Sequence, residues 1–356
     1  MKLNTTKKIK LSILNLYKKI QRELHELQYL FWETTLRCNL SCLHCGSDCL
    51  ADSNIKDMAL KDFLNVLDII KKEYNSNNIV VIFSGGEPLV RKDIEECIYE
   101  IDKKGFPIGM VTNGLAMTEK KYIKLIENGL RTITVSLDGL EKNHNWLRNN
   151  SNSYKKAIET IEYIVNTKNI NYDVVTCVNK RNINELENIK KLLIRMNVKA
   201  WRLFTIFPKG RAKNNQELFL SNEEFKYFID FIIKTRKEKS IKTNYSCEAF
   251  LGNYEGKARD YYFFCRAGIN IGSVLANGDI SACPSLRGDY IQGNIYNDDF
   301  LDVWNNKYQI MRDRRWAKCS ICKDCSDFKY CEGNGLHLRD EKTKELSFCH
   351  WNVLKS

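Results

Sequence analysis

The stretch Thr35-Leu-Arg-Cys-Asn-Leu-Ser-Cys-Leu-His-Cys-Gly46 follows a short apolar segment and holds three cysteines in the spacing C-x3-C-x2-C. Three thiolates are one fewer than a closed structural zinc site or an ordinary cubic iron–sulfur cluster requires. A cluster held by Cys38, Cys42 and Cys45 would therefore keep one iron with an open coordination position. Because a reacting molecule can bind at an open position, this stretch predicts a catalytic iron–sulfur site.

Three further motifs follow apolar, strand-like runs. They are Ser84-Gly-Gly-Glu-Pro88, Val111-Thr-Asn-Gly114 and Val135-Ser-Leu-Asp-Gly139, and Arg148 follows the last of them. Glycines are expected in the first motif because backbone must approach a ligand closely without a Cβ in the way. In barrel-type α/β folds the C-terminal ends of the strands form the active site, so these motifs are expected to meet at one site.

Between residues 28 and 215, strand-like and helix-like patterns alternate. The expected strands are Tyr29–Thr35, Ile79–Phe83, Pro107–Val111, Arg131–Leu137, Tyr172–Val178 and Ala200–Phe207. The expected helices between them are Leu60–Tyr74, Asp93–Lys104, Glu119–Asn128, Tyr154–Thr167 and Ile183–Met196. This alternation predicts an α/β fold, a partial (β/α)6 barrel of the TIM type rather than a closed (β/α)8 barrel.

The four motifs, in this order, resemble the signature of the radical S-adenosylmethionine (radical SAM) enzymes, whose fold is the same partial barrel. The resemblance implies one 4Fe-4S cluster on Cys38, Cys42 and Cys45, with the amino and carboxylate groups of S-adenosylmethionine at the open iron. It implies that His44 lies near the adenine and that Gly85, Gly86 and Glu87 bind the amino group. The remaining implied cofactor contacts are Asn113, Ser136, Asp138 and Arg148.

Alternatives stay open for some of these residues. Asn-Gly is also common in turns, which weakens Asn113 as a cofactor contact. Asp138 and Arg148 would form an ordinary surface ion pair if they did not bind the cofactor, and His44 would simply pack. The run Pro208-Lys-Gly-Arg211 matches a loop common in the family, but the sequence indicates no role for it.

The segments flanking the barrel differ from it in pattern. Residues 1–27 read as a basic amphipathic helix that covers the open side of the barrel, with Ile13, Leu16, Ile20, Leu24 and Leu27 at helical spacing. Residues 216–243 read as a linker helix opened by the capping box Ser221–Glu224. Residues 244–356 combine short strands, glycine turns and cysteines, and are expected to form a separate small α+β domain.

The cysteines of this C-terminal part resemble those of the SPASM domain, an auxiliary-cluster module. By that resemblance Cys322, Cys325, Cys331 and Cys349 hold a distal cluster, and Cys265 and Cys283 hold a cluster nearer the barrel. The family's further cysteine is replaced by Gly335, so Cys319 or Cys247 completes the nearer cluster, or one iron stays open. One or two auxiliary clusters, of the 4Fe-4S type, are therefore expected. Zinc bound by Cys319, Cys322 and Cys325 is the alternative.

Composition narrows the setting. The chain has 356 residues, 43% hydrophobic and 28% charged, which is typical of a globular protein of about two domains. It shows no membrane-span pattern, no export signal and no aromatic-interleaved basic module, so neither a membrane nor a nucleic acid is expected as a partner. Fourteen cysteines then favour cluster ligation over disulfides. Oxygen destroys such clusters, so an anaerobic cytoplasm is expected.

The resemblance implies a radical SAM oxidoreductase or maturase that reductively cleaves S-adenosylmethionine to a 5′-deoxyadenosyl radical and oxidatively modifies a substrate. A ribosomally made peptide that receives a crosslink is the expected substrate, and a flavodoxin or ferredoxin is the expected reductant. A separate peptide-recognition protein is an open possibility. Tetrapyrrole or other small-molecule side-chain modification, an electron-transfer protein and a zinc-binding module are the alternatives. Formylglycine formation is a minor one, because Pro284 stands where sulfatase-maturing relatives have an aspartate.

Overall fold

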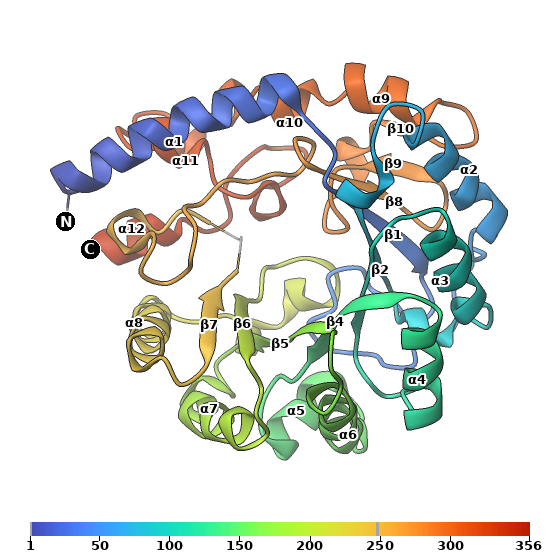
Figure 1. Ribbon diagram of the computed structural model, residues 1–356. Helices are drawn as coiled ribbons and strands as arrows, with labels where there is room; N and C mark the ends of the chain where they lie inside the picture. The colour runs from blue at the N-terminus through green and yellow to red at the C-terminus, as the bar shows by residue number, and fades with distance from the viewer. Residues whose placement is uncertain (1, 247–248) are drawn as a thin grey trace.

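The computed structural model describes residues 2–246 and 249–356, and within them all strands join one sheet (Figure 1). The strand order is β10-β9-β8-β1-β2-β3-β4-β5-β6-β7. The strands are β1 (Tyr29–Thr35), β2 (Val80–Gly85), β3 (Ile108–Thr112), β4 (Leu130–Ser136), β5 (Asn171–Val178), β6 (Ala200–Thr205), β7 (Lys242–Tyr245), β8 (Ile271–Val274), β9 (Asp279–Ser281) and β10 (Gly293–Asn294). The helices are α1 (Thr5–Leu24), α2 (Leu60–Ile70), α3 (Ile94–Lys103), α4 (Glu119–Glu127), α5 (Glu141–Arg148), α6 (Ser153–Val165), α7 (Leu186–Arg195), α8 (Asn222–Glu238), α9 (Phe300–Asn306), α10 (Gln309–Arg312), α11 (Phe328–Cys331) and α12 (His350–Lys355).

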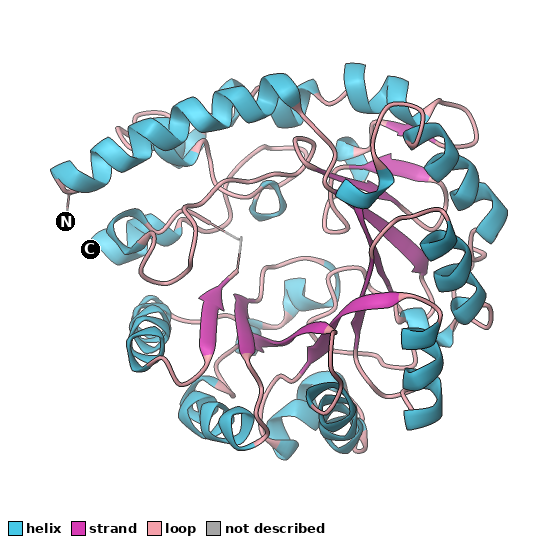
Figure 2. Cartoon of the chain, viewed as in Figure 1, coloured by secondary structure: helices cyan, strands magenta, loops and turns pink. Residues whose placement is uncertain are grey.

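Strands β1 to β7 pair in parallel, each with the next along the chain, and bend into an open barrel with helices on its outer face (Figure 2). The predicted partial barrel is confirmed, and its six predicted strands match β1 to β6 to within two residues at each end. Strand β7 was not predicted. It adds to the edge of β6, so the sheet extends past residue 243, where the sequence placed the end of a linker.

Two helices show where the sequence predicted the helical structure and where it did not. The predicted capping box is present at the start of α8, where the Ser221 hydroxyl accepts from the N–H of Glu224 and the Glu224 carboxylate accepts from the N–H of Ser221. Helix α5, by contrast, was not predicted. It is short and mostly polar, and it ends with Arg148, whose neighbour Asn149 adopts the left-handed conformation that closes the helix.

The C-terminal part is attached through the first barrel strand. Strand β8 pairs in parallel with β1, and β8, β9 and β10 form an antiparallel extension of the sheet. Glu33 of β1 is buried and forms an ion pair with Arg287, which follows β9. The second oxygen of this carboxylate accepts from the N–H of Ala276 at 3.0 Å. Backbone pairing and a buried ion pair therefore both join the C-terminal part to the barrel.

Helix α1 does not cover the barrel with its apolar face, which corrects the prediction from the sequence. Ile13, Leu16, Ile20 and Leu24 are exposed, and of the five predicted contact residues only Leu27 is buried. The buried side of the helix is formed instead by Lys7, Leu11 and Lys18. Helical spacing identifies an apolar face, but polar contacts with the C-terminal part determine which face turns inward.

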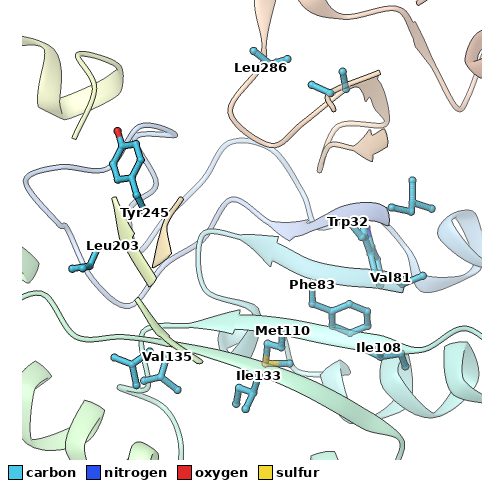
Figure 3. Packing of buried hydrophobic residues seen from close by; sticks show 14 of the residues in the cluster. Trp32, Val81, Phe83, Ile108, Met110, Ile133, Val135, Leu203, Tyr245 and Leu286 are labelled. Carbon is cyan, nitrogen blue, oxygen red and sulfur yellow. The ribbon is translucent and has the colours of Figure 1, made fainter. Parts of the chain in front are cut away.

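The core of the barrel is aromatic near β1. The Trp32 ring stacks on Phe63 of α2 with centroids 4.2 Å apart and meets Phe83 of β2 edge to face at 5.4 Å. Figure 3 shows part of this core, from Trp32 through Phe83 and Met110 to Ile133. All these side chains are almost fully buried. No described helix is long and apolar enough to cross a lipid bilayer.

We expect Phe63→Ala to lower the free energy of unfolding by about 3–5 kcal/mol, because it removes a fully buried ring and leaves a cavity against Trp32. Urea denaturation under anaerobic conditions measures this loss. Ile123→Ala, at a side chain that is 47% exposed, is the control and should change the value by no more than about 0.5 kcal/mol. A loss below about 1 kcal/mol for Phe63→Ala would contradict the stacked core.

Candidate active site

The three cysteines of the first motif lie in the loop between β1 and α2, and all three line one cavity. Cys38 and Cys42 are buried, and Cys45 is half-buried. The N–H of Cys38 donates to the carbonyl of Leu50 at 2.7 Å and closes the loop on itself. The structure therefore brings the predicted cluster-binding thiols together.

The cavity lies at the C-terminal ends of the first four barrel strands. Of the eight predicted cofactor-binding residues, six line it: His44, Gly86, Glu87, Asn113, Ser136 and Arg148. Gly85 and Asp138 are the two that do not, although both are described and both lie directly behind the lining. Because the strands are parallel, their C-terminal ends lie at the same edge of the sheet, and the predicted motifs meet there.

The glycine turn after β2 packs against the end of β1. The N–H of Gly86 donates to the Thr35 carbonyl at 2.8 Å, and the N–H of Glu87 donates to the Arg37 carbonyl at 3.0 Å. A Cβ on Gly85, whose φ is +128°, would lie 2.3 Å from the Thr35 oxygen, and one on Gly86 would lie 2.0 Å from the Arg37 oxygen. These glycines are required because the backbone after β2 lies close to the backbone at the end of β1. The sequence analysis had instead explained them by the close approach of a ligand.

Glu87 is buried and joins the ends of β2 and β3. Its Oε1 accepts from the Thr112 hydroxyl at 2.7 Å and from the Leu89 N–H at 3.2 Å, and its Oε2 accepts from the Asn113 N–H at 2.7 Å. Burial raises the pKa of Glu87 above its ordinary value in spite of these donors. A carboxylate has about four acceptor positions, so three donors leave little of it for a cofactor amino group. Its direct contact with the cofactor stays a prediction.

Arg148 reaches the cavity from α5 and is held by a buried carboxylate. Its Nε and Nη2 donate to Oδ2 of Asp138 at 2.6 and 2.5 Å, and its Nη1 lies 3.9 Å from Sγ of Cys42. Oδ1 of Asp138 accepts from the Cys177 N–H at 2.8 Å. Burial acts to raise the pKa of Asp138, but Arg148 and other neighbours hold it below its ordinary value. The pair is buried, not a surface pair, and Asp138 orients Arg148 instead of lining the cavity.

His44 contributes a polar atom that the described protein leaves unsatisfied. Its Nδ1 is buried and has no hydrogen-bond partner there. Burial lowers the pKa of His44 to about 4, so the ring is neutral near pH 7. Buried polar atoms nearly always have a partner, so this nitrogen in the cavity wall suits a ligand with a polar group.

The thiols of the loop differ in their protonation. Burial raises the pKa of Cys38 to about 12. A hydrogen bond from Cys49 lowers the pKa of Cys45 to about 5, and the same bond raises the pKa of Cys49. Without a cluster, Cys49 is therefore a hydrogen-bond donor to Cys45, and its exclusion as a fourth ligand stays a prediction.

Arg211 was missed by the sequence analysis and lies in the cavity wall. Its Nε donates to the Cys42 carbonyl at 2.8 Å, its backbone N–H donates to the Cys45 carbonyl at 3.1 Å, and its Nη1 pairs with Asp48 at 2.7 Å. The preceding Gly210 has φ +54°, and a Cβ there would lie 2.3 Å from the Cys45 oxygen. The Pro208–Arg211 loop therefore clamps the cysteine loop, a role for which the glycine–arginine pair was the only signal.

A second, small cavity is lined by four thiols of the C-terminal part: Cys322, Cys325, Cys331 and Cys349. These are the four cysteines predicted for the distal cluster. Apolar and aromatic side chains, among them Phe250 and Trp351, form the rest of the wall. Arg339 is buried, and its Nη2 lies 3.3 Å from Sγ of Cys322. Burial raises the pKa of Cys322 above its ordinary value, and the neighbouring Arg339 acts in the opposite direction, toward the thiolate.

The other predicted cluster cysteines stand apart from this cavity. Cys265 and Cys283 are half-buried, and Sγ of Cys319 lies 3.5 Å from the Lys344 carbonyl and 3.7 Å from Nη1 of Arg339. Gly335 caps a short 3-10 helix, and Cys247 lies outside the described residues. The predicted cluster nearer the barrel therefore stays a prediction.

Both cavities suit iron–sulfur clusters in their donors. The first combines four thiols, three of them predicted ligands, with an unsatisfied imidazole nitrogen and two guanidinium groups, which fit an anionic cluster and a ligand with a carboxylate. Within residues 2–246 and 249–356, no three His, Cys, Asp or Glu side chains converge on a single metal ion. Ligands of one zinc ion lie about 2.0–2.3 Å from one point, whereas a cluster spreads its thiolates over several irons.

Comparison with known families decides the assignment. Residues 32–193 match the radical SAM superfamily, and residues 265–326 match SPASM, an iron–sulfur cluster-binding domain. The chain carries a radical SAM domain followed by a SPASM domain. Membership in this enzyme family supports an enzyme over an electron carrier or a zinc-binding module. These domains imply S-adenosylmethionine and iron–sulfur clusters as cofactors.

Curated relatives of this chain include AdoMet-dependent heme synthases and mycofactocin maturases. An AdoMet-dependent heme synthase of Nitratidesulfovibrio vulgaris is 24% identical over 335 residues, which cover 87% of this chain and 90% of the relative. Mycofactocin maturase MftC of Mycolicibacterium smegmatis is 25% identical over 307 residues, which cover 85% of this chain and 76% of the relative.

Solved structures share the fold. Native anSMEcpe with bound AdoMet superposes with a TM-score of 0.71 at 18% identity and covers 92% of this chain and 95% of that one. Streptococcus suis SuiB bound to S-adenosylmethionine superposes with a TM-score of 0.67 at 20% identity and covers 88% of this chain and 73% of that one. These likenesses support the barrel and its C-terminal extension.

We expect Asp138→Asn to lower the free energy of unfolding of the cluster-free chain by about 3–5 kcal/mol near neutral pH, because it leaves the buried Arg148 without its partner. Removal of both charges, as in Asp138→Asn with Arg148→Gln, should restore much of this loss. Chemical denaturation of the wild type and these variants measures both effects. An additive double variant would contradict a coupled pair.

The same pair predicts a pH dependence. The folded-state pKa of Asp138 is depressed, so its contribution is complete above its unfolded pKa of about 3.9 and is lost as the pH falls through the lower folded value. The stability difference between wild type and Asp138→Asn should accordingly be constant from neutral pH down to about pH 5 and shrink below about pH 4. A difference that changes between pH 6 and 8 would exclude Asp138 as its source.

Proposed function

We propose that this chain is a radical SAM oxidoreductase that oxidises a side chain of a ribosomally made peptide. One observation carries the proposal: a single chain presents two thiol-lined cavities, the first with three predicted ligands at the strand ends and the second with four. Three ligands leave an open iron for S-adenosylmethionine, and four make a closed cluster suited to electron transfer.

Some residues of the first cavity would contact the cofactor, and others hold the cavity wall in place. When bound there, S-adenosylmethionine and a reduced cluster supply a carbon radical that takes a hydrogen atom from an unactivated C–H bond. Arg148, oriented by Asp138, can pair with the carboxylate of the methionine moiety, and Ser136 can donate to a ribose or carboxylate oxygen. Glu87 and Arg211 act on the wall itself, because they hold the strand ends and the cysteine loop.

The second cavity would hold the electron acceptor that an oxidation requires. Loss of one hydrogen atom leaves the substrate with an unpaired electron, and loss of one further electron and one proton completes a two-electron oxidation. Cys322, Cys325, Cys331 and Cys349 would hold a cluster there, which would supply an acceptor for that electron. A crosslink within the peptide is a product of this kind.

A peptide substrate is supported by relatives and by charge. Mycofactocin maturase resembles this chain over most of its length, and SuiB, which shares its fold, has been solved with the precursor peptide SuiA. The formal net charge of +12 favours an acidic peptide through long-range attraction. The cytoplasm is the corresponding compartment for a ribosomal product.

Tetrapyrrole side-chain modification is the second candidate. Heme synthases that use AdoMet resemble this chain at a similar identity and with higher coverage of their own length. An iron porphyrin with propionate side chains would also be attracted by a basic surface. Substrate addition separates the two candidates: a peptide substrate should raise nucleoside formation, whereas the porphyrin should not.

We expect the anaerobically reconstituted chain to form 5′-deoxyadenosine from S-adenosylmethionine with dithionite, and Cys42→Ala to form none while losing about four irons per chain. Cys97→Ala, at a buried cysteine of α3 away from both cavities, is the control and should keep its iron and its activity. Iron counts and nucleoside chromatography measure both. Nucleoside formation by Cys42→Ala at the wild-type rate would rule out the radical SAM site.

Loss of the second cluster should separate cofactor cleavage from substrate oxidation. We expect Cys331→Ala to lose about four irons and to keep most of its nucleoside formation, while oxidised product falls more than tenfold because the second electron has no acceptor. Mass spectrometry of the substrate measures the product. Full product formation without this cluster would contradict an electron-accepting role.

A further inference from the structure

The outward face of α1 carries an unusual stripe of large hydrophobic side chains. Six of them are between 43% and 66% exposed, and their spacing of three and four residues places them on one face of the helix. This apolar stripe consists of Ile9, Ile13, Leu16, Tyr17, Ile20 and Leu24. Figure 1 shows α1 on the outer rim of the molecule, along the C-terminal part. Contiguous exposed apolar patches often mark an interaction site.

Polar contacts fix the helix with the stripe outward. Nζ of Lys7 donates to the Glu255 carbonyl, and Nζ of Lys18 donates to the Tyr330 carbonyl at 2.6 Å and lies 3.6 Å from the Glu332 carboxylate. Arg22 forms an ion pair with the same carboxylate. Rotation of α1 to bury the stripe would break these contacts and expose Leu11, which is fully buried. The stripe therefore stays outward in the folded chain.

Basic side chains border the stripe. Lys8, Lys10 and Lys19 are exposed, and Glu23 is the acidic residue within the helix. A groove near the start of the helix carries Lys2, Lys8 and Lys355 with Asp327. A second groove near its end carries Lys19, Arg22, Arg312 and Arg315 with Glu23 and Asp313. The border is therefore predominantly positive, in keeping with the net charge of +12.

We propose that the apolar stripe of α1 is a peripheral docking surface for an anionic membrane. Apolar side chains would enter the boundary of the acyl chains while the bordering lysines extend to lipid phosphates, the arrangement of interfacial amphipathic helices. Tyr17, with an apolar ring and a polar tip, suits the headgroup level. This revises the expectation of no membrane partner: a helix that lies on a bilayer need not be able to span it.

Charge and shape favour this occupant over others. Pairing of two α1 stripes from two copies of the chain would bring lysine borders together and meet repulsion. A partner protein would have to supply a groove that matches a convex, 20-residue helix, about 30 Å long. A bilayer surface accepts a convex ridge without such a groove.

The test is sedimentation of the reconstituted full chain with vesicles of phosphatidylcholine alone or mixed with phosphatidylglycerol. The wild type should bind the mixed vesicles and bind them less at high salt. Leu16→Gln with Ile20→Gln should weaken binding more than tenfold. Removal of Lys8, Lys10 and Lys19 by substitution with Gln should weaken it about fivefold for each lysine. Ile123→Gln, at an exposed hydrophobic residue of α4, is the matched control and should bind like the wild type.

Two readouts keep the result unambiguous. Thermal unfolding and iron content of each variant should equal those of the wild type, because the substituted side chains are exposed. Wild-type protein that ignores the mixed vesicles, or a Leu16→Gln, Ile20→Gln variant that binds them equally well, would overturn the proposal. A dimer in sedimentation equilibrium that this variant dissociates, without lipid binding, would overturn it in favour of a second copy.

Discussion

Hydrogen bonding along both edges of β1 is the constraint on which the two halves of the molecule depend. One edge pairs with β2 of the barrel and the other with β8 of the SPASM part, and the cysteine loop begins where β1 ends. A buried strand must satisfy its backbone groups through its neighbours, so neither pairing can be given up without cost. The thiol cavity and the C-terminal part therefore take their positions from the same seven residues, and the buried Glu33 with Arg287 adds an ionic contact across that boundary.

Apolar runs and the residues after them were enough to predict the barrel and its motifs from the sequence. Strands buried in a parallel sheet read as continuous hydrophobic segments, and six of them were found in this way. Strands β7 and β8, each of four residues, are too short to show a pattern, and α5 is too polar. The orientation of α1 was wrong because spacing reveals an apolar face but not the carbonyl and carboxylate partners that hold Lys7 and Lys18.

Within the site, the sequence identified the right residues more readily than their roles. All four expected residues line the cavity: Asn113 and Ser136 because they lie at strand ends, and His44 and Arg148 from the cysteine loop and the end of α5. Glu87 and Asp138 direct their carboxylates toward the protein, and no motif states which way a side chain turns. Arg211 lies far along the chain from the cysteines that it holds, and distance in sequence hid that contact.

The clamp formed by Gly210 and Arg211 also limits how the barrel can move. It ties the loop after β6 to the loop after β1, and four strands separate β1 from β6 in the sheet. The sheet between these two strands is curved, and the contact between the two loops spans its open side. Any widening between β1 and β6 would therefore either break the hydrogen bond from Arg211 to the Cys42 carbonyl or displace the loop that carries the three cysteines.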